Sequence, residues 1–236
     1  KFAVKTDPKE EEVLEALPGN NCGACGFPGC SGLAAAIAAG EADIASCPVG
    51  GQPVADNIAA IMGVATEATE KKVAYVKCGG SDSAAKQAYE YTGITSCSMM
   101  NLMQDGGPKA CSYGCLGAGD CVKACPFDAI DIVDGIAVIR KDDCRSCEKC
   151  VAACPKKIIE MIPYKQEYFV TCASKDKGKD VMKVCSVGCI ACRKCEKVCQ
   201  YDAIHVVDNI AHIDTSKCTN CGDCYEVCPK KIIYKI

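Results

Sequence analysis

The alternation of polar and apolar positions near the start of the chain predicts short helices. Asp7 followed by Pro8 and an acidic run is typical of a helix start, because it combines an N-cap, a proline in the first turn and favourable charge. Further helices are expected over Ser31–Ala39 and Pro53–Thr69. Together these elements predict a small helical domain over residues 1–70.

Residues 71–110 have a weaker pattern. Val73–Lys77 has the apolar composition of a strand, and Ala84–Tyr91 is rich in residues that favour a short helix. Gly106-Gly107-Pro108 predicts a turn. We therefore treat 71–110 as a segment that connects two domains.

A β-hairpin is predicted twice in the remaining chain. Ile130–Val133 and Ile136–Ile139 flank an Asp-Gly pair, which favours the tight turn between two antiparallel strands. The pattern returns 74 positions later with Asp208 and Asn209 at the turn, and asparagine also tolerates a positive φ. The two hairpins are therefore expected to share one fold.

Each hairpin belongs to a duplicated unit that contains eight cysteines. In the first copy these are Cys111, Cys115, Cys121, Cys125, Cys144, Cys147, Cys150 and Cys154. In the second copy, each shifted by 74 positions, they are Cys185, Cys189, Cys195, Cys199, Cys218, Cys221, Cys224 and Cys228. We interpret 111–165 and 166–236 as tandem domains with an α+β fold.

Composition points to bound metal. The 236 residues include 24 cysteines, four phenylalanines and no tryptophan, so a core poor in aromatic side chains needs another source of stability. A disulfide framework is the alternative, but the thiols of a C-x-x-C-x-x-C loop converge on one point instead of pairing across a fold. So many reduced thiols imply a reducing, anaerobic compartment.

Charge and hydropathy narrow the function further. The formal net charge is −3, and clusters held by four thiolates add negative charge, which disfavours binding to nucleic acid. No apolar run reaches the length of a membrane span.

The sequence around Cys144, Cys147, Cys150 and Cys154-Pro155 has the spacing of iron–sulfur ligation. In such a motif three thiolates of one loop bind one [4Fe–4S] cluster, while the fourth thiolate binds a second cluster. A structural zinc site is the alternative, but zinc sites usually use two separate C-x-x-C pairs. The motif therefore predicts a two-cluster ferredoxin domain of the bacterial type.

Four clusters are predicted from the two copies, each with three cysteines from one loop and one from the other half of the same copy. In the second copy the sets are Cys189, Cys192, Cys195 with Cys228, and Cys218, Cys221, Cys224 with Cys199. In the first copy they are Cys111, Cys115, Cys121 with Cys154, and Cys144, Cys147, Cys150 with Cys125. Cys111 is chosen because Ala118 stands where the second copy has Cys192. If Cys111 does not reach, a three-iron cluster or a different fourth ligand would follow.

A fifth cluster is predicted in the N-terminal domain. Its ligands are Cys22, Cys25, Cys30 and Cys47. Glycines between them allow the backbone to curl close and to aim N–H groups at sulfur, although a zinc knuckle is an alternative. The cysteines outside these sets are Cys78, Cys97, Cys172 and Cys185. Buried free thiols are the favoured interpretation of these four, while a redox-active disulfide or a ligand role stays open.

No residue predicts a catalytic centre. Gly117–Gly119 is not a dinucleotide fingerprint, because no strand precedes it and the third glycine is missing. His205, in the second hairpin, is expected to face solvent. Electrons are therefore expected to enter and leave through protein partners.

Longer stretches of the sequence resemble a known family. LPGNNCGACGFPGCSGLAAAIAAGEA, followed by Cys47-Pro48, resembles the four-cysteine domain of the B subunit of the Rnf complex. KACSYGCLGAGDCVKACPFDAI and KVCSVGCIACRKCEKVCQYDAI are similar to the ferredoxin regions of clostridial-type Rnf B subunits. Family members begin with a membrane-spanning helix just before a segment like KFAVKTDPKEEEV, so we expect that such a helix was removed or truncated before Lys1.

The resemblance implies a role in an ion-translocating ferredoxin:NAD oxidoreductase at the cytoplasmic face of the cell membrane. Such a subunit would accept electrons from reduced ferredoxin and relay them through five [4Fe–4S] clusters to membrane subunits, with Na⁺ or H⁺ movement coupled to the transfer. The alternatives are a free soluble polyferredoxin and a metal-sensing or corrinoid-activating iron–sulfur protein.

Overall fold

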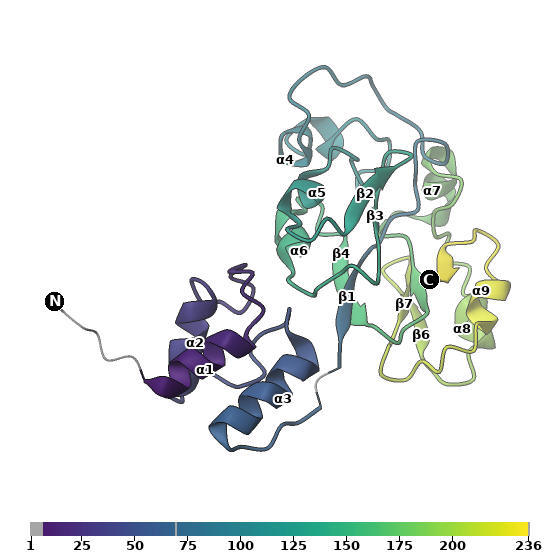
Figure 1. Cartoon of the computed structure of the whole chain (residues 1–236). Helices are drawn as coiled ribbons and strands as arrows, with labels where there is room; N and C mark the ends of the chain where they lie inside the picture. Colours follow the sequence, from purple (N-terminus) through teal and green to yellow (C-terminus); the bar gives the residue numbers. More distant parts are fainter. Residues whose placement is uncertain (1–6, 69, 236) are drawn as a thin grey trace. The chain divides into compact units, whose positions relative to one another are not determined.

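The computed structural model describes residues 7–68 and 70–235 and divides into two compact units (Figure 1). One unit ends at Lys72 and includes Arg145–Glu148, and the other begins at Val73. Within the described ranges, no helix is both long enough and apolar enough to cross a membrane.

The first unit is helical, as the sequence predicts. Its helices are α1 (Pro8–Ala16), α2 (Cys30–Ala38) and α3 (Gly51–Met62). The Asp7 side chain caps α1 by accepting a hydrogen bond of 3.0 Å from the backbone N–H of Lys9. Val13, Leu33 and Ile58 from the three helices meet in the core.

The third helix is shorter than predicted. It ends at Gly63, which has a φ of +72° and closes the helix in the left-handed conformation. The predicted end, Thr69, lies outside the described residues.

The second unit contains the two cysteine-rich copies. The elements of the first copy are β1 (Lys72–Val76), α4 (Cys97–Met100), the 3₁₀ helix η1 (Gln104–Gly106), α5 (Asp120–Ala124), β2 (Ile130–Val133), β3 (Ile136–Ile139), α6 (Lys149–Ala153) and β4 (Ile159–Pro163). Those of the second copy are β5 (Tyr168–Val170), α7 (Gly178–Val184), α8 (Lys194–Val198), β6 (Ile204–Val207), β7 (Ile210–Ile213), α9 (Asp223–Glu226) and β8 (Ile233–Lys235). Both copies run from an outer strand through helices, a hairpin and a helix to a second outer strand.

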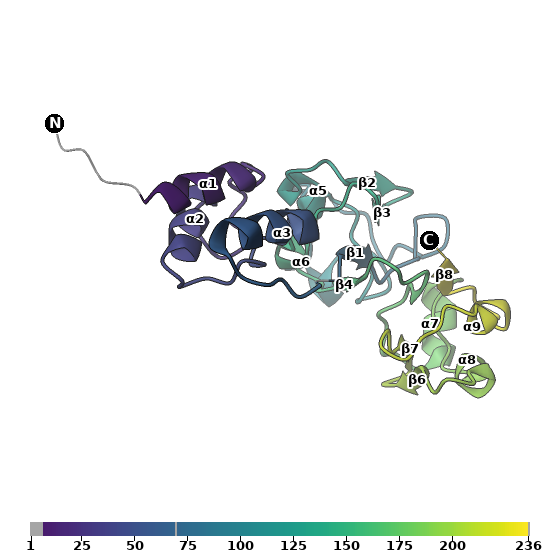
Figure 2. The same cartoon turned by 60° about the horizontal axis from the view of Figure 1, so that its bottom comes forward.

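The predicted hairpins are confirmed. Strands β2 and β3 pair antiparallel, as do β6 and β7, and α8 packs against β6 beside the second hairpin (Figure 2). Asp134 and Gly135 have φ values of 46° and 71°, and Asp208 and Asn209 have 49° and 64°. The turn residues therefore adopt the left-handed conformation that a tight hairpin turn requires.

The segment predicted as a connection, 71–110, contributes a strand to the first copy. Strand β1 pairs with β4, as β5 pairs with β8. The N–H of Lys77 donates to the carbonyl of Ile158 over 2.7 Å, and that of Thr171 donates to Ile232 over the same distance. The duplication therefore starts upstream of residue 111, with the sequence YVKC in one copy and FVTC in the other.

The first copy also contains an insertion. Cys78 and Cys111 are separated by 33 positions, whereas the matching Cys172 and Cys185 are separated by 13. The insertion includes α4 and η1. It breaks the constant spacing of 74. The strand predicted at Val73–Lys77 is therefore confirmed as β1, but the repeat in the sequence did not show that it belongs to the first copy.

The helix predicted over Ala84–Tyr91 does not form. The N–H of Lys86 donates to the carbonyl of Val184 over 2.8 Å, and its carbonyl accepts from Ala110 over 2.9 Å. The segment is extended because it fits between these two backbones, so tertiary pairing overrides its local helix preference.

Cysteine side chains form much of the core in each copy. In the first copy Cys115 and Cys144 pack among Ile130 and Ile159, and all four are buried. The second copy has an equivalent core. Sulfur atoms therefore occupy the interior positions that aliphatic and aromatic side chains fill in most small domains.

Candidate iron–sulfur sites

A cavity in the second copy is lined by four of the predicted ligands. They are Cys189, Cys192, Cys195 and Cys228. Burial raises the pKa of the Cys195 thiol to about 12, and the neighbouring sulfur atoms of the other three add to this rise. Three of the cysteines come from the loop and first turn of α8, and the fourth follows α9. The cavity therefore brings together residues from both halves of the copy.

The complementary set in the second copy is also brought together. Burial raises the pKa of Cys224 to about 11, and Cys218, Cys221 and Cys199 lie close enough to raise it further. Cys199 directly follows α8, which packs against α9. Each helix thus leads to cysteines of both predicted sets, as the crosswise ligation expected from the motif requires.

Backbone N–H groups point at the crosswise cysteines. The N–H of Ala203 donates to Sγ of Cys199 over 3.4 Å, and at the matching position Ala129 donates to Cys125 over 3.5 Å. Such donors favour negatively charged sulfur, which is the state of a cysteine bound to metal.

One side chain also donates to sulfur. Gln166 is 2% exposed, and its Nε2 lies 3.4 Å from Sγ of Cys218 and 2.7 Å from the carbonyl oxygen of Tyr168. No motif in the sequence singles out this glutamine, because its role depends on contacts with residues distant in the chain.

In the first copy the cavity is lined by four cysteines that are not the four predicted as one ligand set. It is lined by Cys97, Cys115, Cys121 and Cys154. Burial raises the pKa of Cys121 to about 12, with further contributions from the sulfur atoms of the other three. The sequence favoured Cys111 as the fourth member, but Cys111 lines a different cavity.

Asp120 holds the segment that carries Cys97. Its Oδ2 accepts hydrogen bonds of 3.0 Å from Oγ of Ser96, 2.9 Å from the N–H of Ser98 and 3.0 Å from Oγ of Ser98. Burial raises the pKa of Asp120, but these hydrogen bonds outweigh burial and leave the pKa below its ordinary value. Because Asp120 directly precedes Cys121, it ties the two cysteines to one place.

The other predicted set of the first copy lies around α6. Cys144 and Cys150 are buried in the core, and Cys125 packs against it. The N–H of Ala74 donates to Sγ of Cys144 over 3.5 Å. Cys147 is half-buried in the loop between Cys144 and Cys150.

The predicted N-terminal ligands lie beside the helical core of the first unit. Cys25, Cys30 and Cys47 pack against it, and Cys22 is half-buried in the same loop. Burial raises the pKa of Cys47, a hydrogen bond of 3.4 Å from the N–H of Gly50 opposes the rise, and Cys25 and Cys30 add to it. Cys25, Cys30 and Cys47 therefore lie within electrostatic reach of one another.

Two of the cavities are each lined by four thiols. Four thiols are the donor set of a [4Fe–4S] cluster, in which each thiolate binds a different iron, and also of a structural zinc site.

Comparison with protein families agrees with this chemistry. Residues 17–49 match the family described as "Putative Fe-S cluster". Residues 106–165 and 188–232 each match a family described as "4Fe-4S dicluster domain". An iron–sulfur domain is thus followed by two dicluster ferredoxin domains.

Relatives that match nearly the whole of this chain are also found. This chain is 44% identical to the B subunit of the ion-translocating oxidoreductase complex of Methanosarcina acetivorans, and the match covers 98% of this chain and 88% of that relative. It is 47% identical to the B subunit of the Na⁺-translocating ferredoxin:NAD⁺ oxidoreductase complex of Acetobacterium woodii, over 98% and 70% of the two chains. It is 42% identical to the B subunit of the proton-translocating ferredoxin:NAD⁺ oxidoreductase complex of Clostridium ljungdahlii, over 100% and 84%.

Proposed function

Because the chain belongs to the family of B subunits of ion-translocating, Rnf-type oxidoreductase complexes, we propose that it relays electrons from reduced ferredoxin to membrane subunits of a ferredoxin:NAD oxidoreductase. It is an iron–sulfur electron-transfer subunit of that enzyme complex. Two cavities that are each lined by four cysteines, one in each copy, are the observation that supports a relay most directly, since each offers the donor set of one cluster. We place the subunit at the cytoplasmic face of the membrane, where soluble ferredoxin is available.

The proposal includes five [4Fe–4S] clusters with the following ligands. The sets are Cys22, Cys25, Cys30 and Cys47; Cys97, Cys115, Cys121 and Cys154; Cys125, Cys144, Cys147 and Cys150; Cys189, Cys192, Cys195 and Cys228; and Cys199, Cys218, Cys221 and Cys224. The N-terminal cluster lies in the domain 1–70. The next two clusters lie in the domain 111–165, to which strand β1 and Cys97 are added, and the last two lie in the domain 166–236. Cys97 replaces Cys111 in the set because it lines the cavity with the other three thiols.

A bound [4Fe–4S] cluster supplies a centre that gains and loses one electron. The residues around it set how readily this happens: buried aliphatic side chains exclude water, and N–H donors to sulfur favour the more negative, reduced state. Ala203 and Gln166 are such donors in the second copy. Neither residue forms or breaks a covalent bond during electron transfer.

Reduction by ferredoxin tests the function. Anaerobically purified, iron-loaded protein should lose its visible iron–sulfur absorbance when mixed with reduced ferredoxin, because its clusters accept the electrons. In vesicles that contain the membrane subunits, the reduced protein should then be reoxidised when NAD is supplied. A fully loaded protein that ferredoxin does not reduce would contradict the proposed donor. Reduction without reoxidation in such vesicles would favour a free polyferredoxin.

The Cys97→Ala variant tests the revised ligand set. Removing this thiol leaves one iron without a protein ligand, so we expect a loss of about one to four irons per chain and, where one iron is lost, a three-iron electron paramagnetic resonance (EPR) signal. Met99→Ala is the control, since Met99 lies on the same helix and is exposed. Unchanged iron content and spectra in Cys97→Ala would refute the assignment.

A further inference from the structure

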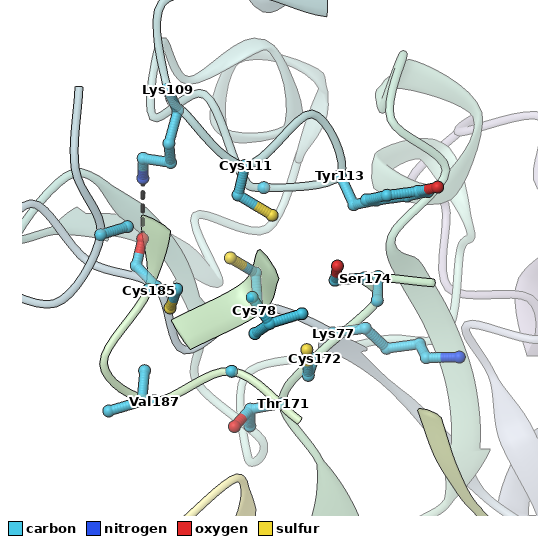
Figure 3. Close-up of a pocket in the computed structure, with 16 residues that line it drawn as sticks. Lys77, Cys78, Lys109, Cys111, Tyr113, Thr171, Cys172, Ser174, Cys185 and Val187 are labelled. Carbon is cyan, nitrogen blue, oxygen red and sulfur yellow. Dashed lines mark hydrogen bonds between the residues drawn. The ribbon is translucent and has the colours of Figure 1, made fainter. Parts of the chain in front are cut away.

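One lysine of the first copy is buried. Among residues 7–68 and 70–235, Lys109 is the only charged side chain in the interior, with 3% of its surface exposed. It lines a cavity to which both copies contribute, together with Cys111 and Cys185 (Figure 3). The dashed line in Figure 3 marks a hydrogen bond from its ammonium to a backbone carbonyl oxygen. The electron relay proposed above assigns no role to this cation.

The ammonium of Lys109 contacts carbonyl oxygens. Its Nζ donates to the carbonyl oxygen of Gly80 over 2.8 Å and to that of Gly135 over 3.4 Å. Within the described part of the chain, no carboxylate is close enough to form an ion pair with it. Asp134 lies within electrostatic reach, but its carboxylate is exposed to water and accepts a hydrogen bond of 2.6 Å from Oγ of Ser83. A buried ammonium is costly unless negative charge lies nearby, so this charge suits an anionic group inside the fold.

The backbone and the stem of Lys109 are both held in place. On either side of it, the N–H of Ala110 donates to the carbonyl of Lys86 over 2.9 Å, and the carbonyl of Pro108 accepts from the N–H of Ala88 over 2.7 Å. The stem passes close to Gly114, where a Cβ would lie 3.0 Å from Cδ of the lysine. Gly114 directly precedes a cysteine of the first-copy cavity, so the positive charge is fixed beside a ligand loop.

The charge of Lys109 acts on that cysteine, Cys115. Burial raises the pKa of Cys115, whereas a hydrogen bond of 3.4 Å from the N–H of Ala137 and the charge of Lys109 oppose the rise. A positive charge that favours a thiolate also favours an added electron on metal bound to that thiolate, because both are negative charges in a medium of low polarity.

The second copy has no equivalent buried cation. The shift of 74 positions matches Lys109 to Lys183. Lys183 is exposed on α7, and its Nζ forms an ion pair of 2.7 Å with Oδ1 of Asp180. Water and the paired carboxylate both weaken the field of this second lysine. Two lysines at matching positions therefore differ in their effect on the interior.

Another lysine contact is the same in both copies. Nζ of Lys156 lies 2.7 Å from the carbonyl oxygen of Ser112, and Nζ of Lys230 lies 3.1 Å from that of Ser186. Lys156 and Lys230 are also related by the shift of 74. They favour reduction equally in the two copies, so the difference between the copies comes from Lys109.

We propose that Lys109 raises the reduction potential of the cluster held by Cys115 above that of the matching cluster held by Cys189, and so directs electrons from the second copy to the first. This inference rests on the proposed function, since it concerns two of its clusters. In each transfer one electron leaves the second copy, where a cluster is oxidised, and reduces a cluster of the first copy. No covalent bond forms or breaks.

Redox titration of two variants tests the role of the charge. Lys109→Met removes the ammonium from a side chain of similar length, and Lys109→Gln keeps an N–H donor without the charge. In both, the equilibrium constant for reduction of the cluster whose EPR signal is missing from Cys97→Ala should fall about tenfold, which is about 59 mV for one electron. Lys183→Met is the matched control, because Lys183 is exposed, and should leave every potential unchanged.

Unchanged potentials in both Lys109 variants would overturn the proposal even if the thermal midpoint falls, because the lysine would then only stabilise the fold. The wild type provides a test that does not depend on how these variants fold. The EPR signal missing from Cys97→Ala should titrate at a higher potential than the signal missing from Cys192→Ala, and the reverse order would overturn the proposal. A wild type that has this order but is not reduced by ferredoxin would contradict the proposed function and leave the role of Lys109 standing.

Discussion

Gln166 should raise the reduction potential of the cluster held by Cys218, and its removal should lower that potential. A hydrogen bond to a ligand sulfur stabilises the reduced cluster more than the oxidised one, because the reduced cluster is more negative. We choose Gln166→Met, since methionine fills a similar volume but has no donor. The change removes the contact with Cys218 and also the bond to the carbonyl of Tyr168.

The size of the effect follows from the geometry. A hydrogen bond of this kind contributes about 1 kcal/mol, which for one electron corresponds to about 40 mV. Because the bond is present in both oxidation states, only part of this value appears in the potential, so we expect a decrease of about 20–40 mV. Loss of the hydrogen bond to the carbonyl of buried Tyr168 costs about 1–3 kcal/mol of stability, which lowers the thermal midpoint but leaves the fold intact.

An anaerobic redox titration followed by EPR measures the reduction potentials. The difference between the titrations of wild type and variant identifies the cluster whose potential changes. Gln87→Met is the matched control, because Gln87 is exposed and donates to Asp82 instead of a sulfur atom. An unchanged potential in Gln166→Met, or an increase, would refute the reasoning.

Two further predictions concern the loops of the first copy. Gly117→Ala should destabilise the loaded protein by about 2–4 kcal/mol, because Ala is strained at φ +70° and its Cβ would lie 2.5 Å from the carbonyl oxygen of Gly135. Gly119→Ala is the control: its φ is +79° and its Cβ would have no contact below 3.8 Å, so this variant should be destabilised by only about 1 kcal/mol. Equal thermal midpoints of cluster absorbance in the two variants would contradict this. Asp120→Ala should speed the release of iron to a chelator, since it frees the segment of Cys97. The pKa of Asp120 in the folded protein lies below the ordinary 3.8, so the stabilising effect of its carboxylate is complete above pH 3.8 and is lost only as the pH falls through the lower pKa. The excess iron release of the variant over the wild type should therefore be equal at about pH 6 and about pH 8. A difference between the two pH values would argue against the carboxylate as the cause.

The sequence predicted those features that depend on short spacings. The set around Cys195 and Cys228 and its partner set around Cys224 and Cys199 follow from a motif whose geometry is local within each loop. The hairpins followed from turn residues such as Asp134, which tolerate the left-handed conformation. These features need little information from the rest of the fold.

The features that the sequence did not predict depend on distant contacts. Cys97 reaches its cavity because Asp120, more than twenty positions later, accepts hydrogen bonds from Ser96 and Ser98 on either side of it. A strand was predicted at Val73–Lys77, but its place in the first copy was missed because the insertion shifts Cys78 out of the 74-residue spacing, although YVKC and FVTC are similar enough to have revealed it. The Ala84–Tyr91 segment is extended because two backbones pair with it, and composition carries no record of that pairing.

The insertion between Cys78 and Cys111 also limits what length variation this protein can tolerate. Insertions in connecting segments are usually gained and lost freely, because few contacts depend on them. Here the extra residues contain Cys97, which lines one cavity with Cys115. The first copy has Ala118 at the position where the second copy has a cysteine, so Cys97 supplies the thiol that would otherwise be missing. Shortening this loop to match the second copy would therefore remove a proposed ligand, unless Ala118 were replaced by cysteine at the same time. A deletion that looks like a harmless trimming of a surface loop should be tolerated only together with that point substitution.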